Sequence, residues 1–265
     1  MKDDRFDFVV YTPCHRFIQG ETAQAFELAK MNNINFLWVP VVGDAMIGRA
    51  RSLIASQFMR LRMAPYLIFV DSDIVFTPDD LKRLYGHLKA GYEYIGGLYT
   101  VKTAAHSAHF GFNGKSVIDG KVNEVKYLSC GFTGISRALL ERMVKELELP
   151  LLHKGDAFEC YPFFEGGQFQ DDDVGWIYLS EDWDFTVKAR KLGVKAYCDT
   201  GIRLGHIGTT LWTVEQLIMM ERAKREATVV NMEMSGDPIV NFGEEATVLP
   251  VQQAETRFRS EPEGS

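Results

Sequence analysis

The sequence has few cysteines, no long apolar run and no excess of positive charge, and each absence excludes a class of protein. Its four cysteines, Cys14, Cys130, Cys160 and Cys198, are widely spaced and form no C-x-x-C pair, which excludes the usual zinc and dithiol motifs and favours reduced, buried thiols. No apolar run approaches the ~18 residues that a membrane span needs. Lys and Arg number 29 against 36 Asp and Glu, and a net charge of −7 argues against a broad nucleic-acid-binding surface.

The start of the chain carries no visible signal for export. Residues 1–5 lead directly into a strand-like segment, without an apolar stretch of signal-peptide length. With neither that signal nor a membrane span, we expect a cytoplasmic protein. The 265 residues are 46% hydrophobic and 25% charged, as in an ordinary globular protein that has a core of its own.

Short apolar runs alternate with helical patterns in the first hundred residues. Residues 7–11 and 36–42 predict strands, and Pro40 indicates that the second of these lies at an edge of the sheet. Apolar residues at helical spacing follow each strand, over residues 19–31 and from about Asp44, a good N-cap. This alternation predicts an α/β fold.

Residues 66–70 (Y-L-I-F-V) form an uninterrupted apolar run of strand length, which is typical of a central strand covered on both faces. Thr77-Pro78 then begins a helix that runs to about Lys89, with the capping residue and proline that helix starts favour. Beyond residue 100 the pattern becomes mixed. There we predict a hairpin over 116–127, a helix over 137–148, a long loop over 149–178 in which 171–173 are solvated, a helix from Ser180 and a loop over 202–210.

The strongest candidate site is the triplet Asp71-Ser72-Asp73, which directly follows the apolar strand. Ligands of open α/β sheets bind beyond the carboxyl ends of the strands, and two carboxylates there can hold a divalent cation against a diphosphate. The cation then stabilises charge on a departing phosphate. Taken alone, the two acids are equally compatible with a simple turn cap.

Two further segments carry candidate residues. His206 lies between Gly205 and Gly208, where glycines let the backbone turn and the imidazole reach a ligand, although a loop histidine is often only hydrogen-bonded. Glu181 and Asp182 lie in the first turn of a helix. One of them could be the general base for an acceptor hydroxyl, but helix electrostatics alone also accounts for acids at that position.

Seven weak motifs occur in one order, and together they resemble the GT-A class of glycosyltransferases, particularly family 2 and its viral and bacterial relatives. They cover about residues 6–212 and are, in chain order, Tyr11-Thr12-Pro13, Ala50-Arg51-Ser52, residues 66–75, Gly96-Gly97-Leu98-Tyr99 with Lys102, Gly131-Phe132-Thr133-Gly134, residues 180–185, and Gly205-His206-Ile207-Gly208. One departure is Ser52, where those relatives usually have Asn.

The resemblance implies a Rossmann-like, mostly parallel central sheet flanked by helices, with a smaller mixed region on the acceptor side. We expect a single catalytic domain over residues 1–250. Its nucleotide-binding half would span residues 1–100 and its acceptor and metal half 101–227, followed by a flexible tail over 251–265.

The resemblance also implies roles for individual residues. Asp73 would ligate Mn²⁺ or Mg²⁺ directly with His206, while Asp71 would contact the ribose or a metal-bound water, and Asp182 would be the base, with Glu181 as the second candidate. The remaining donor-binding residues would be Thr12, Pro13, Arg51, Ser72, Lys102, Gly131 and Gly134.

The implied reaction moves a sugar from a UDP- or GDP-sugar to a hydroxyl of a glycan or other acceptor. It would invert the anomeric carbon, and a retaining transfer is the alternative. The triplet and the two residues after it also fit the D-x-D-x-[T/V] motif of haloacid-dehalogenase-like phosphatases, although that motif usually follows the first strand. A third hypothesis is a module that binds a nucleotide sugar without turnover.

Overall fold

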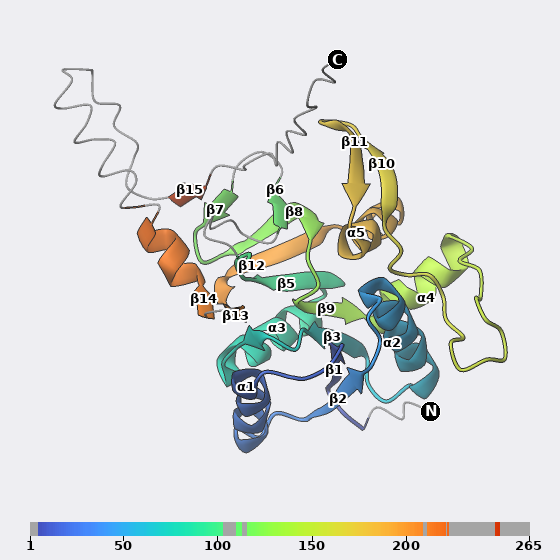
Figure 1. Ribbon diagram of the computed structural model, residues 1–265, viewed down its shortest axis with the longest axis horizontal. Coiled ribbons are helices and arrows are strands. Elements are labelled where there is room, and N and C mark those ends of the chain that lie inside the picture. The colour runs from blue at the N-terminus through green and yellow to red at the C-terminus, as the bar shows by residue number, and fades with distance from the viewer. Residues whose placement is uncertain are drawn as a thin grey trace, which may run out of the picture.

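The computed structural model describes residues 5–102, 110–112, 116–208, 211–220, 222 and 247–249, so the expected tail over 251–265 lies outside the described residues. An eight-stranded sheet in the order β2-β1-β3-β9-β5-β12-β8-β6 forms its centre (Figure 1). The strands of this sheet are β1 (Phe8–Cys14), β2 (Phe36–Val42), β3 (Tyr66–Val70), β5 (Tyr94–Leu98), β6 (Phe110–Phe112), β8 (Val122–Leu128), β9 (Phe132–Ser136) and β12 (Ala196–Arg203).

The sheet is mixed, because β9 lies antiparallel between β3 and β5. β1 pairs in parallel with β2 and β3, and β12 pairs in parallel with β5. The carboxyl ends of β1, β3 and β5 therefore meet at one edge of the sheet, and the start of β9 joins them there. The predicted α/β class is confirmed, and Pro40 does lie in the edge strand β2.

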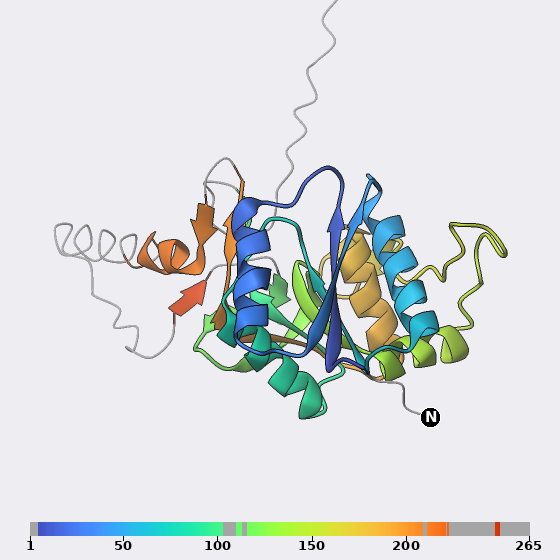
Figure 2. The same ribbon diagram turned by 90° about the horizontal axis from the view of Figure 1, so that it is seen from below.

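Helices cover both faces of the sheet (Figure 2). α1 (Gly20–Met31) and α3 (Pro78–Lys89) pack on one face, and α2 (Ile47–Leu61), α4 (Arg137–Glu146) and α5 (Glu181–Lys191) pack on the other. Each face has its own cluster of buried hydrophobic residues. All four cysteines are buried and free, as expected. Within the described part of the chain, no helix is long and apolar enough to cross a membrane.

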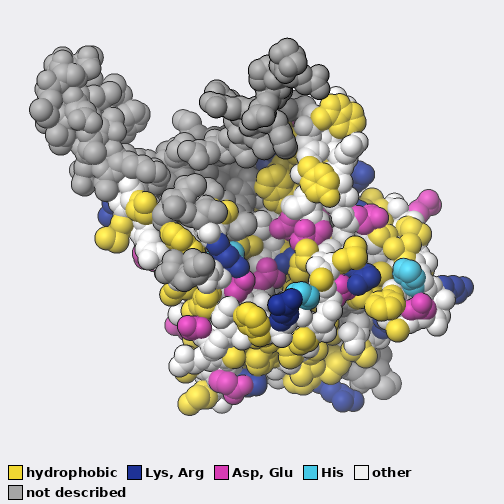
Figure 3. All heavy atoms as spheres, in the orientation of Figure 1, with side chains coloured by type: hydrophobic (Ala, Val, Ile, Leu, Met, Phe, Trp, Pro, Cys, Tyr) yellow, Lys and Arg dark blue, Asp and Glu magenta, His cyan; other side chains and the backbone are white. Residues whose placement is uncertain are grey.

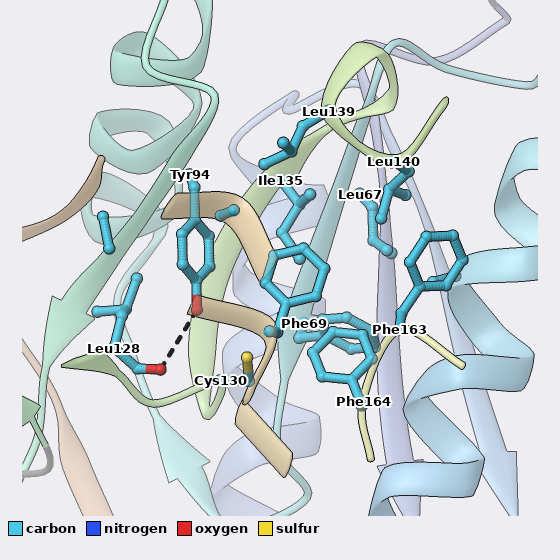
Figure 4. Packing of buried hydrophobic residues seen from close by; sticks show 14 of the residues in the cluster. Leu67, Phe69, Tyr94, Leu128, Cys130, Ile135, Leu139, Leu140, Phe163 and Phe164 are labelled. Atoms are coloured by element: carbon cyan, nitrogen blue, oxygen red, sulfur yellow. Dashed lines mark hydrogen bonds between the residues drawn. The ribbon is translucent and has the colours of Figure 1, made fainter. Parts of the chain in front are cut away.

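The core under α2 and α5 also holds part of the long segment between α4 and α5. Phe164 meets Phe69 of β3 edge-on, with ring centroids 5.6 Å apart (Figure 4). It also stacks on Phe185 of α5, with ring centroids 4.6 Å apart. The hydroxyl of Tyr94 donates to the carbonyl of Leu128 at 3.3 Å in the same region. This packing fixes residues 163–164 against the sheet and so shapes the surface next to the start of α5.

Helix starts follow the local sequence in one case and not in another. α3 begins as predicted, with a capping box between Thr77 and Asp80. α2 begins later than predicted, at Ile47 with Met46 as N-cap, because the Asp44 carboxylate instead accepts hydrogen bonds from Met46 N and the Arg49 guanidinium. An acid near a helix start can therefore fix the approach of the chain without being the cap.

Two predictions in the second half are wrong. The hairpin over 116–127 does not form, since β7 (Ser116–Ile118) pairs with β15 (Thr247–Leu249) while β8 pairs with β6 and β12. The loop over 149–178 contains a hairpin of β10 (Gly167–Asp171) and β11 (Gly175–Leu179). Asp171 is buried rather than solvated, because the Lys126 ammonium and the Tyr127 hydroxyl donate to its carboxylate.

His206 lies in a strand and not in the predicted loop. β13 (Gly205–Ile207) pairs with β4 (Ile74–Val75) and β14 (Leu211–Thr213), followed by a helical segment over 214–220. Gly205 serves close packing rather than a sharp turn, since a Cβ there would come within 2.8 Å of Leu211 Cδ1 and 3.2 Å of Val75 Cβ. The strand pairing sets His206 directly opposite Ile74, and so next to the acidic triplet.

Candidate active site at the carboxyl edge of the sheet

The triplet Asp71-Ser72-Asp73 forms a tight connection between β3 and β4. Asp71 N donates to the carbonyl of Gly131 at 2.9 Å, and Ile74 N donates back to the carbonyl of Asp71 at 3.2 Å. Gly131 precedes β9, so the triplet is tied to both neighbouring strands at the edge where parallel strands end. The two carboxylates of the triplet have different partners.

The Asp73 carboxylate lies beside a histidine and a lysine. His206 Nε2 is 3.5 Å from Asp73 Oδ1, and the Lys102 ammonium donates to Oδ2. Ile207 N also donates to the Asp73 carbonyl at 2.8 Å, which fixes the two strands in register. Burial alone would raise the pKa of Asp73, but hydrogen bonds and positive charge from His206 and Lys102 outweigh burial and hold this pKa below its usual range.

The ring of His206 is oriented by its other nitrogen. Nδ1 lies 2.7 Å from the carbonyl of Thr100, and a carbonyl only accepts, so Nδ1 carries the proton of that hydrogen bond. Nε2 then faces Asp73, where it can either donate to the carboxylate as part of an imidazolium or offer its lone pair to a cation. A carbonyl that fixes the tautomer in this way is the usual support behind a metal-ligating histidine.

The donor set at this point is one imidazole and one carboxylate. Cis ligands each about 2.1 Å from an ion in octahedral geometry lie about 3.0 Å apart, close to the 3.5 Å between His206 Nε2 and Asp73 Oδ1. Nowhere in the described ranges does a group of three or more His, Cys, Asp and Glu side chains converge so that it could hold a metal ion.

The Asp71 carboxylate belongs to a second, drier cluster. Arg51 of α2 is 3% exposed, and its guanidinium donates to Asp71 Oδ1 at 2.7 Å and to Glu181 Oε1 at 3.2 Å. Burial raises the pKa of Asp71 and likewise that of Glu181, in each case against the opposing charge of Arg51. Arg51 therefore holds two carboxylates from distant parts of the chain on either side of one guanidinium.

Glu181 and Asp182 both lie in the first turn of α5, but they face different surroundings. The Asp182 carboxylate accepts hydrogen bonds from the Ser180 hydroxyl and from Trp183 N. Glu181 lines an open cleft with a volume of about 850 Å³. A carboxyl group with a raised pKa at the wall of a cleft is the arrangement that suits a general base.

The cleft lies between the start of α2, residues 152–166 and the junction of β11 with α5. Its walls include Met46, Phe158, Tyr178 and Glu181, and they do not include Asp73 or His206. Arg51 connects the two areas, since it binds Glu181 at the cleft and Asp71 next to Asp73. Figure 3 shows acidic and basic side chains close together in the middle of this face, below the hydrophobic side chains of the protruding hairpin.

The remaining predicted residues lie in three places. Gly131 is at the edge, where a Cβ would come within 2.6 Å of the Tyr99 hydroxyl oxygen, and Ser72 lies in the triplet itself. Thr12 and Pro13 are buried within β1, and the Thr12 hydroxyl accepts a hydrogen bond from Trp38 Nε1 at 2.9 Å. Gly134 lies away from the edge, in the middle of β9, where the absent side chain makes room for Leu88.

Two contributors to this edge are not apparent from residue type. Thr100 acts through its backbone carbonyl, which no side-chain pattern predicts. Tyr99 is buried, its hydroxyl accepts from Gly131 N at 2.9 Å, and its ring meets that of His206 edge-on at 5.3 Å. Tyr99 belongs to the motif Gly96-Gly97-Leu98-Tyr99, but the resemblance implied no role for it at this edge.

Comparison with known proteins supports the architecture. No family model matches the sequence, and no curated protein matches it. In structure the chain is similar to A197 from STIV, with a TM-score of 0.51 and 18% identity over 76% of this chain and 85% of that one. At this identity the similarity concerns the fold alone. The chain thus shares an α/β fold with that protein.

Proposed function

We propose that this protein transfers a sugar from a nucleotide-sugar donor, a UDP- or GDP-sugar, to a hydroxyl group of an acceptor. The observation that carries the proposal is the pairing of Asp73 with a histidine whose ring is already oriented by the Thr100 carbonyl, at the carboxyl edge of a glycosyltransferase-like fold. Ligands of open α/β sheets bind at this edge. The adjoining cleft supplies space for an acceptor.

A divalent cation is part of this proposal, with Asp73 and His206 as the residues that would hold it. Oxygen and imidazole ligands suit Mn²⁺, and Mg²⁺ is the alternative. When bound, such an ion supplies neutralising charge for a departing diphosphate. Lys102 donates a hydrogen bond to the Asp73 carboxylate, which also faces His206. Its ammonium is a second positive charge that could contact donor phosphate oxygens.

The second cluster would activate the acceptor. Glu181 lines the cleft with a raised pKa, so we propose that its carboxylate accepts the proton of the acceptor hydroxyl as that oxygen attacks the anomeric carbon. Asp182, the base that the resemblance implies, is the neighbouring alternative. Arg51 would position Glu181 and Asp71 without contacting the reacting atoms. A single attack by the acceptor inverts the anomeric carbon.

The test is a panel of UDP- and GDP-sugars assayed for thermal stabilisation and for slow release of the nucleotide, each with and without Mn²⁺. A bound donor raises the apparent melting temperature by mass action. We expect one donor to stabilise the protein only when Mn²⁺ is present, and Asp73→Asn to abolish that shift. Full cation-dependent turnover by Asp73→Asn, or release of phosphate from simple phosphate esters without any sugar donor, would overturn the proposal.

Glu181→Gln and Asp182→Asn then separate the two candidate bases. The true base should lose acceptor-dependent transfer while it keeps donor binding, and its neighbour should lose much less. Proton NMR of the product anomer decides between inversion and retention, and a retained configuration would remove the role of either residue as base.

A further inference from the structure

The β10–β11 hairpin carries an exposed face with an unusual composition. Trp176 and Tyr178 lie two residues apart on β11, so their side chains share one face, and they are 73% and 79% exposed. The strand register sets Gln170 directly opposite Trp176 and Gln168 directly opposite Tyr178. Each aromatic ring thus has a neutral amide beside it on the same face. We call these four residues the outer hairpin face.

The other face of the hairpin is held in place. Phe169 and Ile177 pack against a buried cluster of Tyr127, Leu179 and Val187. Trp183 of α5 packs against the same cluster, and its ring stacks on that of Tyr127 at 4.5 Å. At the end of β10, Asp171 accepts hydrogen bonds from Lys126 and Tyr127 of β8. The outer hairpin face is therefore presented by a strand pair that is anchored to the body of the protein, which lowers the entropy lost when a ligand binds.

The composition of this face favours a neutral ligand rich in hydroxyl groups. The C–H faces of a sugar ring pack on aromatic rings, and an amide offers both a donor and an acceptor to hydroxyl groups. None of the four side chains is charged. The acids Asp172 and Asp173 at the tip of the hairpin oppose an anionic lipid surface.

The outer hairpin face is continuous with the cleft of the candidate active site. Tyr178 belongs to this face and also lines the cleft, and the cleft wall continues through Leu179 and Ser180 to Glu181. A ligand that lies on Trp176 and Tyr178 can therefore extend one end to the carboxylate of Glu181.

We propose that the outer hairpin face binds a neutral oligosaccharide, which is the acceptor whose terminal hydroxyl enters the cleft at Glu181. This inference rests on the proposed transferase function for the role of the ligand as acceptor. It does not depend on that function for the binding itself, so binding can be measured without donor or metal.

The first experiment is calorimetric titration of the full chain with soluble neutral tetrasaccharides of glucose, mannose, galactose and N-acetylglucosamine. We expect at least one to bind wild type, and Trp176→Ala to weaken that binding about tenfold, equivalent to about 1.4 kcal/mol. Val174→Ala is the matched control, because Val174 is exposed on the turn of the same hairpin but lies outside the outer hairpin face. The control should bind as wild type does.

The second experiment separates this proposal from the proposed function. With the tetrasaccharide as acceptor, Trp176→Ala should raise the KM for the acceptor about tenfold and leave the slow hydrolysis of donor without acceptor unchanged.

If no tetrasaccharide binds wild type, or if Trp176→Ala binds as wild type does, this inference is wrong even where donor hydrolysis persists. Loss of binding to phosphatidylglycerol vesicles in Trp176→Ala, without any saccharide binding, would overturn it in favour of a membrane. If saccharide binds through Trp176 but no donor is hydrolysed, the outer hairpin face is a saccharide-binding surface and the proposed transferase function is wrong.

Discussion

Two clusters in this protein each combine an aspartate, a histidine and a basic side chain, yet they differ in how the aspartate is used. Asp199 in β12 is 0% exposed, and its carboxylate accepts from Arg83 Nε and Nη2, from His87 Nε2 and from Gly201 N. Asp73 is 24% exposed, with Lys102 on one oxygen and His206 Nε2 3.5 Å from the other. Residue types alone would not separate the two clusters.

The difference lies in what remains available to a ligand. Each oxygen of Asp199 accepts two protein hydrogen bonds, so this cluster is closed and its role is to join α3 to the sheet. The Asp73 cluster lies at the carboxyl edge of the sheet, is open to solvent, and contains a histidine nitrogen turned towards a carboxylate by a hydrogen bond behind it. Saturation of hydrogen bonds therefore distinguishes a structural acid from a candidate ligand.

The largest expected effect is on activity at the open cluster. Asp73→Asn should lower kcat/KM of the proposed transfer about a thousandfold, which corresponds to about 4 kcal/mol of lost charge stabilisation. Unfolding in urea should change by less than about 1 kcal/mol, since Asp73 is partly solvated. The control is Asp79→Asn, an exposed acid in the first turn of α3. If Asp73→Asn lowered the free energy of unfolding as much as Asp199→Asn does, the distinction between the two clusters would be wrong.

The next largest effect is on stability at the closed cluster. Asp199→Asn should lower the free energy of unfolding by about 2 to 3 kcal/mol, near the lower end for a broken buried ion pair because the Arg83 side chain is partly exposed. Urea denaturation followed by circular dichroism measures this loss. Asp172→Asn on the exposed hairpin tip serves as control. If Asp199→Asn is as stable as wild type, hydrogen-bond saturation is no guide to structural importance here.

The contribution of Asp199 to the free energy of unfolding should depend on pH. Burial alone would raise the pKa of Asp199, but Arg83, His87 and Gly201 N hold it below its ordinary value. The stabilisation is therefore present above the unfolded pKa of about 4, and is lost as pH falls through the folded pKa, because the unfolded state then binds more protons. The difference in unfolding free energy between wild type and Asp199→Asn should shrink below about pH 4. A difference that grows on acidification would contradict the assigned charge state.

The smallest effect concerns Lys102, which competes with a cation for Asp73. Lys102→Met should tighten Mn²⁺ binding in the absence of donor about fivefold, since an ion pair as exposed as this one is worth up to about 1 kcal/mol. Calorimetric titration with Mn²⁺ gives the affinity, and Lys82→Met, in an exposed pair on α3, is the control. Weaker Mn²⁺ binding in Lys102→Met would show that the lysine supports the cation site and does not oppose it.

Local signals in the sequence were sufficient where neighbours in the chain decide the structure. The apolar run of residues 66–70 forms the central strand β3, and Thr77 caps α3 as its sequence predicts. The predicted hairpin over 116–127 was wrong because strand pairing depends on the whole fold. β7 and β8 pair with other strands and belong to different sheets. Asp171 was misplaced for a similar reason, since its partners Lys126 and Tyr127 lie about forty-five residues earlier in the chain.

The candidate site shows the same division. The sequence supplied Asp73, His206 and Glu181 as candidates, and their roles as metal ligands and base stay predictions. It did not indicate that Arg51 joins Asp71 to Glu181, nor that Thr100 orients His206, because the first is a contact across 130 positions and the second uses a backbone carbonyl.

The sequence by itself determined the α/β class, the central apolar strand and the acids that follow it, because these depend on hydrophobic patterning and on capping within a few residues. Only the tertiary structure decided that β9 makes the sheet mixed, that His206 lies in a strand beside Asp73, and that an anchored hairpin exposes Trp176 and Tyr178, of which Tyr178 also lines the cleft. Those features depend on strand order and burial. Both are set by packing between segments that lie far apart in the sequence, which a local sequence pattern does not reveal.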